Sequence, residues 1–249
     1  RKTVSWPWPC EWVPTNNVAV PVGSKRISAV SSPIAAARSI TAGQYFLDLN
    51  SASPGVKQRA ARAIHAADGR FVEGAVMAPI PPHGIQVPIA CSGPHAIEIA
   101  NLLKPFGFQI DVVSNEIGFA SALKMCRSIM MKGMEALMVE CMVAARAHGV
   151  EQRVIESLNE TLPGIDWSER ARYVIGRVML HGRRRAEEMR EAAQMIEELG
   201  MAPLMASAIA KRQDWVADLG IAPDLPTNVT TDYRALADAI LRAAGPHGA

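Results

Sequence analysis

Lys124 lies in a stretch that is otherwise mostly small or apolar, "GFASALKMCRSIMMKG" at residues 118–133. A lysine among apolar side chains is costly unless it is paired or neutralised. One interpretation is a side chain that extends from a helix toward water. The other is a lysine in a cleft, where desolvation lowers the pKa of the amine so that it accepts a proton near neutral pH. The residue pattern alone leaves both open.

A second group of polar residues follows the short apolar segment "YFLDLN" at residues 45–50. Asn50 and Ser51 come where a strand ends, and ligands of α/β proteins lie at such strand ends. The same region could instead cap the next helix, since Ser53 is a plausible N-cap and Pro54 suits the first helical position. The two roles are compatible.

The run "HGRRRAEEMREA" begins at His181 and offers side chains that bind anions. An arginine such as Arg184 matches a carboxylate or phosphate with two parallel hydrogen bonds. The spacing favours a solvated helix face with the i,i+4 pairs Arg183/Glu187 and Arg184/Glu188. The alternative places His181 and one arginine near a substrate.

Strands and helices that could position these residues alternate in the first half of the chain. Strand-like segments begin at "ISAV" (residue 27) and continue at 45–50, 70–77, 87–93 and 108–113, with helical segments at about 53–69 and 94–107. This alternation predicts βαβ units and a largely parallel sheet. Residues 1–26 show neither periodicity and are expected to be irregular.

After residue 115 the strand signals stop. A helix of about 30 residues is expected from about 117 to 148, followed by helices near 151–161, 167–180, 182–199, 204–218 and 231–244. We therefore expect an irregular segment (1–26), a partial Rossmann-type α/β domain (27–115) and an all-α domain (116–249). The long helix is apolar on nearly every face, which predicts a domain or subunit interface and a homodimer.

Composition excludes several classes of protein. The 249 residues carry a formal net charge of only +2, so nucleic acid is not an expected partner. The sequence contains no run of about 18 uncharged apolar residues, so no membrane-spanning helix is expected. The four cysteines form no CxxC pair and have no histidine at metal-ligand spacing, which predicts a reduced, cytoplasmic protein without a metal site.

Four motifs occur in a recognisable order: "D-x-N-S-x-x-P" from Asp48, "FVEGAVMAP", "PIACSGP" and "SNEIGFASALKMC". Over residues 27–220 this order resembles the β-hydroxyacid dehydrogenases, which include 3-hydroxyisobutyrate and 6-phosphogluconate dehydrogenases. The runs "KG-x-x-AL" from Lys132 and "RR-x-x-EM" from Arg184 resemble a branch described as phosphogluconate-dehydrogenase-like NAD-binding proteins.

The resemblance implies a Rossmann domain that binds NAD or NADP and a helical domain that helps to close the cleft and form the dimer. A lysine at the start of the long helix, here Lys124, then exchanges a proton with the substrate hydroxyl while hydride moves to the nicotinamide. Residues implied to bind the cofactor are Asn50 and Ser51 at its nicotinamide end and Val30, Ser31 and Pro33 in the loop beneath it.

Three departures bear on the substrate. Met77-Ala78-Pro79 replaces a Ser-Gly-Gly that cradles the substrate carboxylate in the family, and proline lacks an N–H donor. Ser128 stands where the family often has an asparagine, four residues after the lysine. Met131 replaces the acid that serves 6-phosphogluconate decarboxylation, so that reaction is not expected.

The glycine-rich fingerprint G-x-G-x-x-G, which binds the pyrophosphate, is absent from residues 1–44. The match begins at the family's fourth strand, so we expect an N-terminally incomplete domain with an unpaired sheet edge and impaired dinucleotide affinity.

The sequence therefore predicts an NAD(P)-dependent oxidoreductase acting on a small hydroxy acid or related small molecule. One alternative is an inactive helical dimerisation module, which the missing fingerprint favours. Another is an imine-reducing relative, which the loss of the carboxylate cradle favours.

Overall fold

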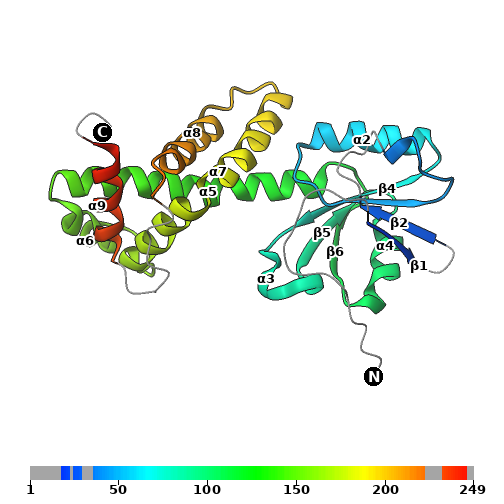
Figure 1. The fold of residues 1–249 in the computed structure, drawn as a ribbon, viewed down its shortest axis with the longest axis horizontal. Helices are drawn as coiled ribbons and strands as arrows, with labels where there is room; N and C mark the ends of the chain where they lie inside the picture. Colours follow the sequence, from blue (N-terminus) through cyan, green and yellow to red (C-terminus); the bar gives the residue numbers. More distant parts are fainter. Residues whose placement is uncertain (1–17, 23–24, 30–35, 222–231, 246–249) are drawn as a thin grey trace. The chain divides into compact units, whose positions relative to one another are not determined.

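The computed structural model describes residues 18–22, 25–29, 36–221 and 232–245. The chain divides into two compact units, Arg1–Ser121 and Ala122–Ala249. The first is an α/β unit and the second is helical, so the predicted fold class is confirmed (Figure 1). No described helix is long and apolar enough to cross a membrane.

The α/β unit contains a six-stranded sheet in the order β1-β2-β3-β4-β5-β6. The strands are β1 (Val18–Val22), β2 (Lys25–Ala29), β3 (Tyr45–Asp48), β4 (Arg70–Val76), β5 (Pro88–Ser92) and β6 (Gln109–Ser114). The pairs β2–β3, β3–β4 and β5–β6 are parallel, whereas β1–β2 and β4–β5 are antiparallel.

The antiparallel pairing of β4 with β5 departs from the largely parallel sheet that the sequence predicts. The segment between them holds only the short helices α3 (Ile80–His83) and η1 (Gly84–Gln86). A parallel connection needs a crossover of a dozen or more residues, usually through a full helix. The short connection therefore reverses the chain.

The sequence pattern predicts that residues 1–26 are irregular, and this prediction was wrong in part. Strand β1 lies in this segment, and β2 begins at Lys25. The register runs from Val18 opposite Ala29 to Val22 opposite Lys25. The outer edge of β2, expected to be unpaired, is thus covered by β1. The five-residue strand contains Pro21, which an edge strand tolerates and which masks the strand pattern in the sequence.

Helices pack on both faces of this sheet because successive strand residues point to opposite faces. The helix α2 (Pro54–Ala66) packs against Phe46 and Phe71, while α4 (Ala96–Leu103) packs against Leu47 and Val72. Ser53 caps α2 as predicted, its hydroxyl accepting a hydrogen bond from the Val56 N–H at 3.4 Å.

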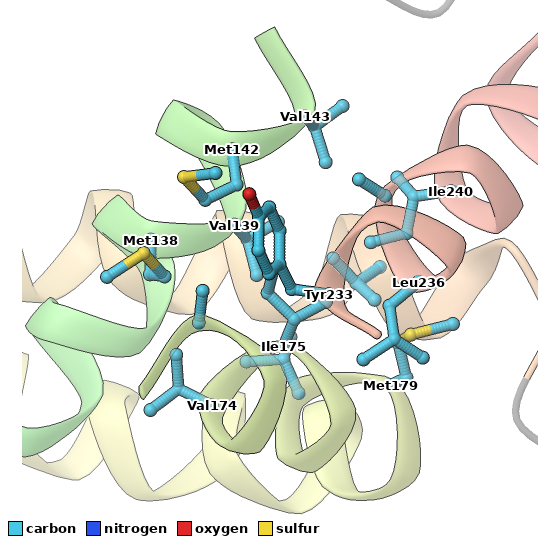
Figure 2. Packing of buried hydrophobic residues seen from close by; sticks show 14 of the residues in the cluster. Met138, Val139, Met142, Val143, Val174, Ile175, Met179, Tyr233, Leu236 and Ile240 are labelled. Carbon is cyan, nitrogen blue, oxygen red and sulfur yellow. The ribbon is translucent and has the colours of Figure 1, made fainter. Parts of the chain in front are cut away.

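The helical unit contains α5 (Phe119–Ala147) from Ala122 onward, since the first residues of α5 belong to the α/β unit. Its other helices are α6 (Glu151–Thr161), α7 (Trp167–Glu198), α8 (Leu204–Asp218) and α9 (Tyr233–Ala244). The predicted long helix is confirmed as α5. Figure 2 shows the core around Tyr233 of α9, which lies among apolar side chains of α5 and α7. These include Met138, Met142, Val174 and Ile175.

The two helices predicted at 167–180 and 182–199 are in fact one continuous helix, α7. Gly182 is a close-packing position and does not break the helix. A Cβ at this residue would lie 2.6 Å from the backbone oxygen of Gln213 in α8. The glycine therefore lets α8 approach α7, a requirement that a local sequence pattern cannot reveal.

Candidate functional site

A row of polar residues crosses the sheet at one level. Asp48 of β3 pairs in register with Glu73 of β4, which pairs with Ser92 of β5, which in turn lies opposite Ser114 of β6. Asp48, Glu73 and Ser92 have exposed fractions of 3%, 0% and 0%. Buried polar groups at this density require specific partners.

The buried ion pair of this row joins Asp48 to Lys57 of α2. Lys57 Nζ lies 3.0 Å from Asp48 Oδ2 and donates a hydrogen bond to the Asp48 backbone oxygen at 3.1 Å. The other carboxylate oxygen, Oδ1, accepts hydrogen bonds from the Asn50 backbone N–H at 3.0 Å and from Asn50 Nδ2 at 2.7 Å. Asn50 itself is exposed, so a buried charge pair orients an exposed amide.

Glu73 fastens the start of α5 to the sheet. Its Oε2 accepts hydrogen bonds from the Ser92 hydroxyl at 2.8 Å and from the Gly118 N–H, and its Oε1 accepts one from the Ser121 N–H at 2.6 Å. The Ser92 hydroxyl oxygen also accepts from the Ala120 N–H at 3.1 Å. A carboxylate at a helix N-terminus satisfies unpaired N–H groups and interacts favourably with the helix dipole.

Glu73, Asp48 and Lys57 are not among the functional residues that the sequence pattern predicts. The available signal was a single acidic residue inside the apolar strand "RFVEGAV", which is costly unless the carboxylate finds a partner.

Cys91 lies next to this row in β5 and is fully buried. Burial raises the pKa of its thiol to about 12, with a further increase from Glu73 and an opposing effect of Lys57. The thiol is therefore protonated at neutral pH and unsuited to act as a nucleophile.

The remaining predicted residues of the α/β unit take varied positions. Ser51 is exposed next to Asn50. Met77 donates its N–H to the Pro88 backbone oxygen at 2.9 Å, so this N–H extends the sheet instead of facing a ligand. Ala78 packs against the core beneath α4. Val30, Ser31 and Pro33 lie outside the described residues.

In the helical unit, an ion pair joins α5 to α7 close to the predicted lysine. Lys132 Nζ lies 2.7 Å from Glu188 Oε2 and donates a hydrogen bond to the Ser128 hydroxyl at 3.2 Å. Lys124 is half-buried one turn before Ser128 on α5.

Nearby cationic side chains change the pKa of the Glu188 carboxyl. Burial acts to raise its pKa, but Lys132, Arg184 and Lys124 outweigh that effect, so the pKa is lowered overall. The structure thus brings Lys124, Ser128 and Arg184 together around one partly buried ion pair, Lys132–Glu188.

The other charges of the "HGRRR" run differ from the predicted i,i+4 pairs. Arg183 pairs with Asp214 and Asp218 of α8 and not with Glu187, and Glu188 pairs with Lys132. His181 is exposed, and partial burial together with Arg184 lowers its pKa. The predicted Arg183/Glu187 pair was wrong, because Asp214 and Asp218 of α8 bind Arg183. Arg184 does act on Glu188 electrostatically, but the close ion-pair partner of Glu188 is Lys132 of α5.

A second, fully buried pair explains why the two sequence runs occur together. Arg185 Nε lies 2.6 Å from Glu135 Oε2, and the other guanidinium and carboxylate atoms form a second contact. Gln213 of α8 donates to the same carboxylate at 3.4 Å. Two ion pairs, Lys132–Glu188 and Glu135–Arg185, therefore join "KG-x-x-AL" to "RR-x-x-EM".

One family model matches part of the helical unit. Residues 145–216 match the model of a domain of unknown function (DUF1932). This region includes Glu188 and Arg185, the α7 partners of the two ion pairs, and Gln213 of α8, which donates a hydrogen bond to Glu135.

Two solved structures resemble most of the chain. A conserved hypothetical protein from Sinorhizobium meliloti 1021 is 37% identical, with a TM-score of 0.76 over 87% of this chain and 75% of that one. A conserved protein of unknown function, described as structurally similar to 3-hydroxyacid dehydrogenases, is 34% identical with a TM-score of 0.66 over 77% of this chain and 74% of that one.

An uncharacterised 28.5 kDa protein encoded in the 7S RNA 5′ region of Methanothermus fervidus is 30% identical over 160 residues. The match covers 64% of this chain and 61% of that relative, which is less than two thirds of the relative's length.

Proposed function

This chain belongs to the β-hydroxyacid dehydrogenase-like proteins, and we propose that it takes part in NAD(P)-dependent hydride transfer to or from a small hydroxy acid or a related substrate. The observation that carries the proposal is the exposed Asn50 carboxamide, held at the carboxyl end of β3 by the buried Asp48. In α/β proteins this end of a strand is where ligands bind.

The described residues fit the nicotinamide end of such a cofactor. Asn50 uses its Nδ2 group as a donor to Asp48, which leaves the amide oxygen to accept a hydrogen bond from a nicotinamide carboxamide. The bound cofactor would supply or accept the hydride. The 249 residues contain no G-x-G-x-x-G motif, so this fit concerns the nicotinamide end and not the pyrophosphate.

Lys124 is the proposed acid/base for the substrate oxygen. Its position is half-buried, and its charge interacts with Glu188, which also binds Lys132. Proton transfer at a substrate hydroxyl needs a group that can both donate and accept a proton, and the amine of a half-buried lysine can do both. Ser128, held by Lys132, is the proposed contact for the substrate next to this lysine.

Titration with NADPH and NADH tests the cofactor proposal directly. We expect saturable binding with Kd below about 100 μM, or about 5.5 kcal/mol, and weaker binding by Asn50→Ala. The matched control is Asn159→Ala, an exposed asparagine of α6 in the other unit. Absence of binding by a folded chain, or equal effects of the two substitutions, would contradict the proposal.

Turnover with NAD(P) and a panel of small hydroxy acids and imines tests Lys124. Lys124→Ala should abolish most oxidation of a hydroxy acid, whereas Lys211→Ala, an exposed lysine of α8, should not. Unchanged turnover by the Lys124 variant would remove the acid/base assignment and favour an imine-reducing enzyme.

A second candidate is a helical dimerisation module, which an exposed apolar row on α5 favours. Leu123, Met130, Met134 and Leu137 are 42%, 66%, 37% and 61% exposed and follow one another at helical spacing. Exposed apolar patches of this kind mark interfaces. We propose a homodimer, which Leu137→Glu should convert to a monomer in sedimentation experiments. Leu199→Glu, at the end of α7, is the control.

A further inference from the structure

The buried pair Asp48–Lys57 is more elaborate than stability requires. Its two side chains are 3% and 1% exposed, so both charges are removed from water. Desolvation of two ions can cost as much as their attraction returns, and apolar residues of similar size often replace such pairs without loss of stability. The pair therefore invites an explanation other than packing.

The two oxygens of the Asp48 carboxylate have separate partners. Oδ2 contacts the Lys57 ammonium at 3.0 Å, while Oδ1 accepts both the backbone N–H and the side-chain Nδ2 of Asn50. Lys57 also donates to the Asp48 backbone oxygen, so one ammonium contacts both the side chain and the backbone of Asp48. The carboxylate thus has one orientation, which in turn sets the conformation of Asn50.

An exposed asparagine would ordinarily sample several side-chain orientations. Here the Asp48 carboxylate fixes the amide orientation. A carboxylate accepts hydrogen bonds, the Asn50 Nδ2 group donates them, and the Asn50 amide oxygen has no proton to donate. The Asn50 oxygen is thereby turned away from Asp48 and remains an acceptor. The ligand group that suits it is a donor such as an amide N–H.

We propose that Asp48 and Lys57 are positioning residues, which hold the Asn50 carboxamide so that its oxygen accepts a hydrogen bond from the nicotinamide carboxamide. The choice of ligand rests on the function proposed above. The orientation of Asn50 rests only on the described contacts and can be tested without any ligand.

Two double variants separate positioning from the loss of the ion pair. Asp48→Asn/Lys57→Met removes both charges but keeps an oxygen that can accept from Asn50. Asp48→Leu/Lys57→Met has similar volume and removes that oxygen. Neither leaves an uncompensated buried charge, so both are expected to fold, which circular dichroism would verify.

The first readout is the order parameter of the Asn50 side-chain NH2 group, measured by 15N relaxation and assigned with Asn50→Ala. It should be high in the unmodified chain and in Asp48→Asn/Lys57→Met, and low, below about 0.6, in Asp48→Leu/Lys57→Met. The second readout is the Kd for NADPH. Loss of the oriented hydrogen bond should weaken binding about tenfold in the leucine variant and less than about threefold in the asparagine variant.

An ordered Asn50 amide in the folded leucine variant would overturn the positioning role, as would equal NADPH affinities of the two double variants. If the unmodified chain binds no NADPH, the proposed function fails, and the relaxation data alone decide whether Asp48 and Lys57 position Asn50. The two failures are therefore distinguishable.

Discussion

Gly182 permits a sharp test of how α7 and α8 pack. An alanine there adds one methyl group 2.6 Å from the Gln213 backbone oxygen and 3.2 Å from Ala217 Cβ. A backbone oxygen cannot rotate away as a flexible side chain can. The two helices must therefore move apart, or the backbone must distort.

The magnitude follows from a comparison within the same helix. Glycine to alanine in a helix interior contributes about 1 kcal/mol of stability through propensity. At Gly176 the added Cβ would meet only Leu236 Cδ1 at 3.9 Å, an ordinary contact, so Gly176→Ala should show this gain. At Gly182 overpacking costs about 1–3 kcal/mol or more. Because propensity is common to both, the variants should differ by about that amount.

The assay is urea unfolding followed by circular dichroism at 222 nm, with both variants and the unmodified chain under the same conditions. We expect Gly176→Ala to raise the unfolding midpoint and Gly182→Ala to lower it. If Gly182→Ala is as stable as Gly176→Ala, α8 does not approach α7 closely at this point, and close packing is not the role of Gly182.

Three further outcomes are expected. Glu135→Gln leaves Arg185 as an uncompensated buried charge and should lower the free energy of unfolding by about 3 kcal/mol or more; a loss below about 1 kcal/mol would count against a buried pair. The Cys91 thiol, with its pKa raised to about 12, should resist alkylation at pH 8 until the chain unfolds; labelling of the native chain, seen by peptide mass spectrometry, would contradict this. The pKa of Glu188 is lower in the folded chain than in the unfolded chain. Its ionised carboxylate therefore stabilises the fold at pH values above the unfolded-state pKa, and this stability is lost as the pH falls through the folded-state pKa. Lys132→Met should therefore lower the urea midpoint at pH 7 more than at pH 3, and a gap independent of pH would refute this origin.

Much of the fold follows from local pattern. The strand–helix alternation up to residue 115 and the long apolar segment after it predicted β3 to β6, α2, α4 and α5. The pattern did not reveal β1, because Pro21 masks a five-residue strand whose pairing with β2 defines it. It also split α7 at Gly182, since propensity alone does not register a neighbouring helix.

Individual side chains at the site were less accessible to sequence reasoning. Asn50, Ser51, Lys124 and Ser128 were identified from motifs, and their functional roles stay predictions. The charges that surround them were not anticipated, because Asp48 and Lys57 looked like an ordinary strand end and helix surface.

What the sequence determined by itself was the order and type of most elements and the motifs at their ends, because these depend on the 2.0 and 3.6 residue periodicities and on caps. The tertiary structure alone decided which charges are paired. Glu73 becomes the anchor of α5, and Lys132 the partner of Glu188, only because distant segments meet. A buried charge is tolerated only where another part of the chain supplies its partner, and that partner is not encoded at any fixed spacing.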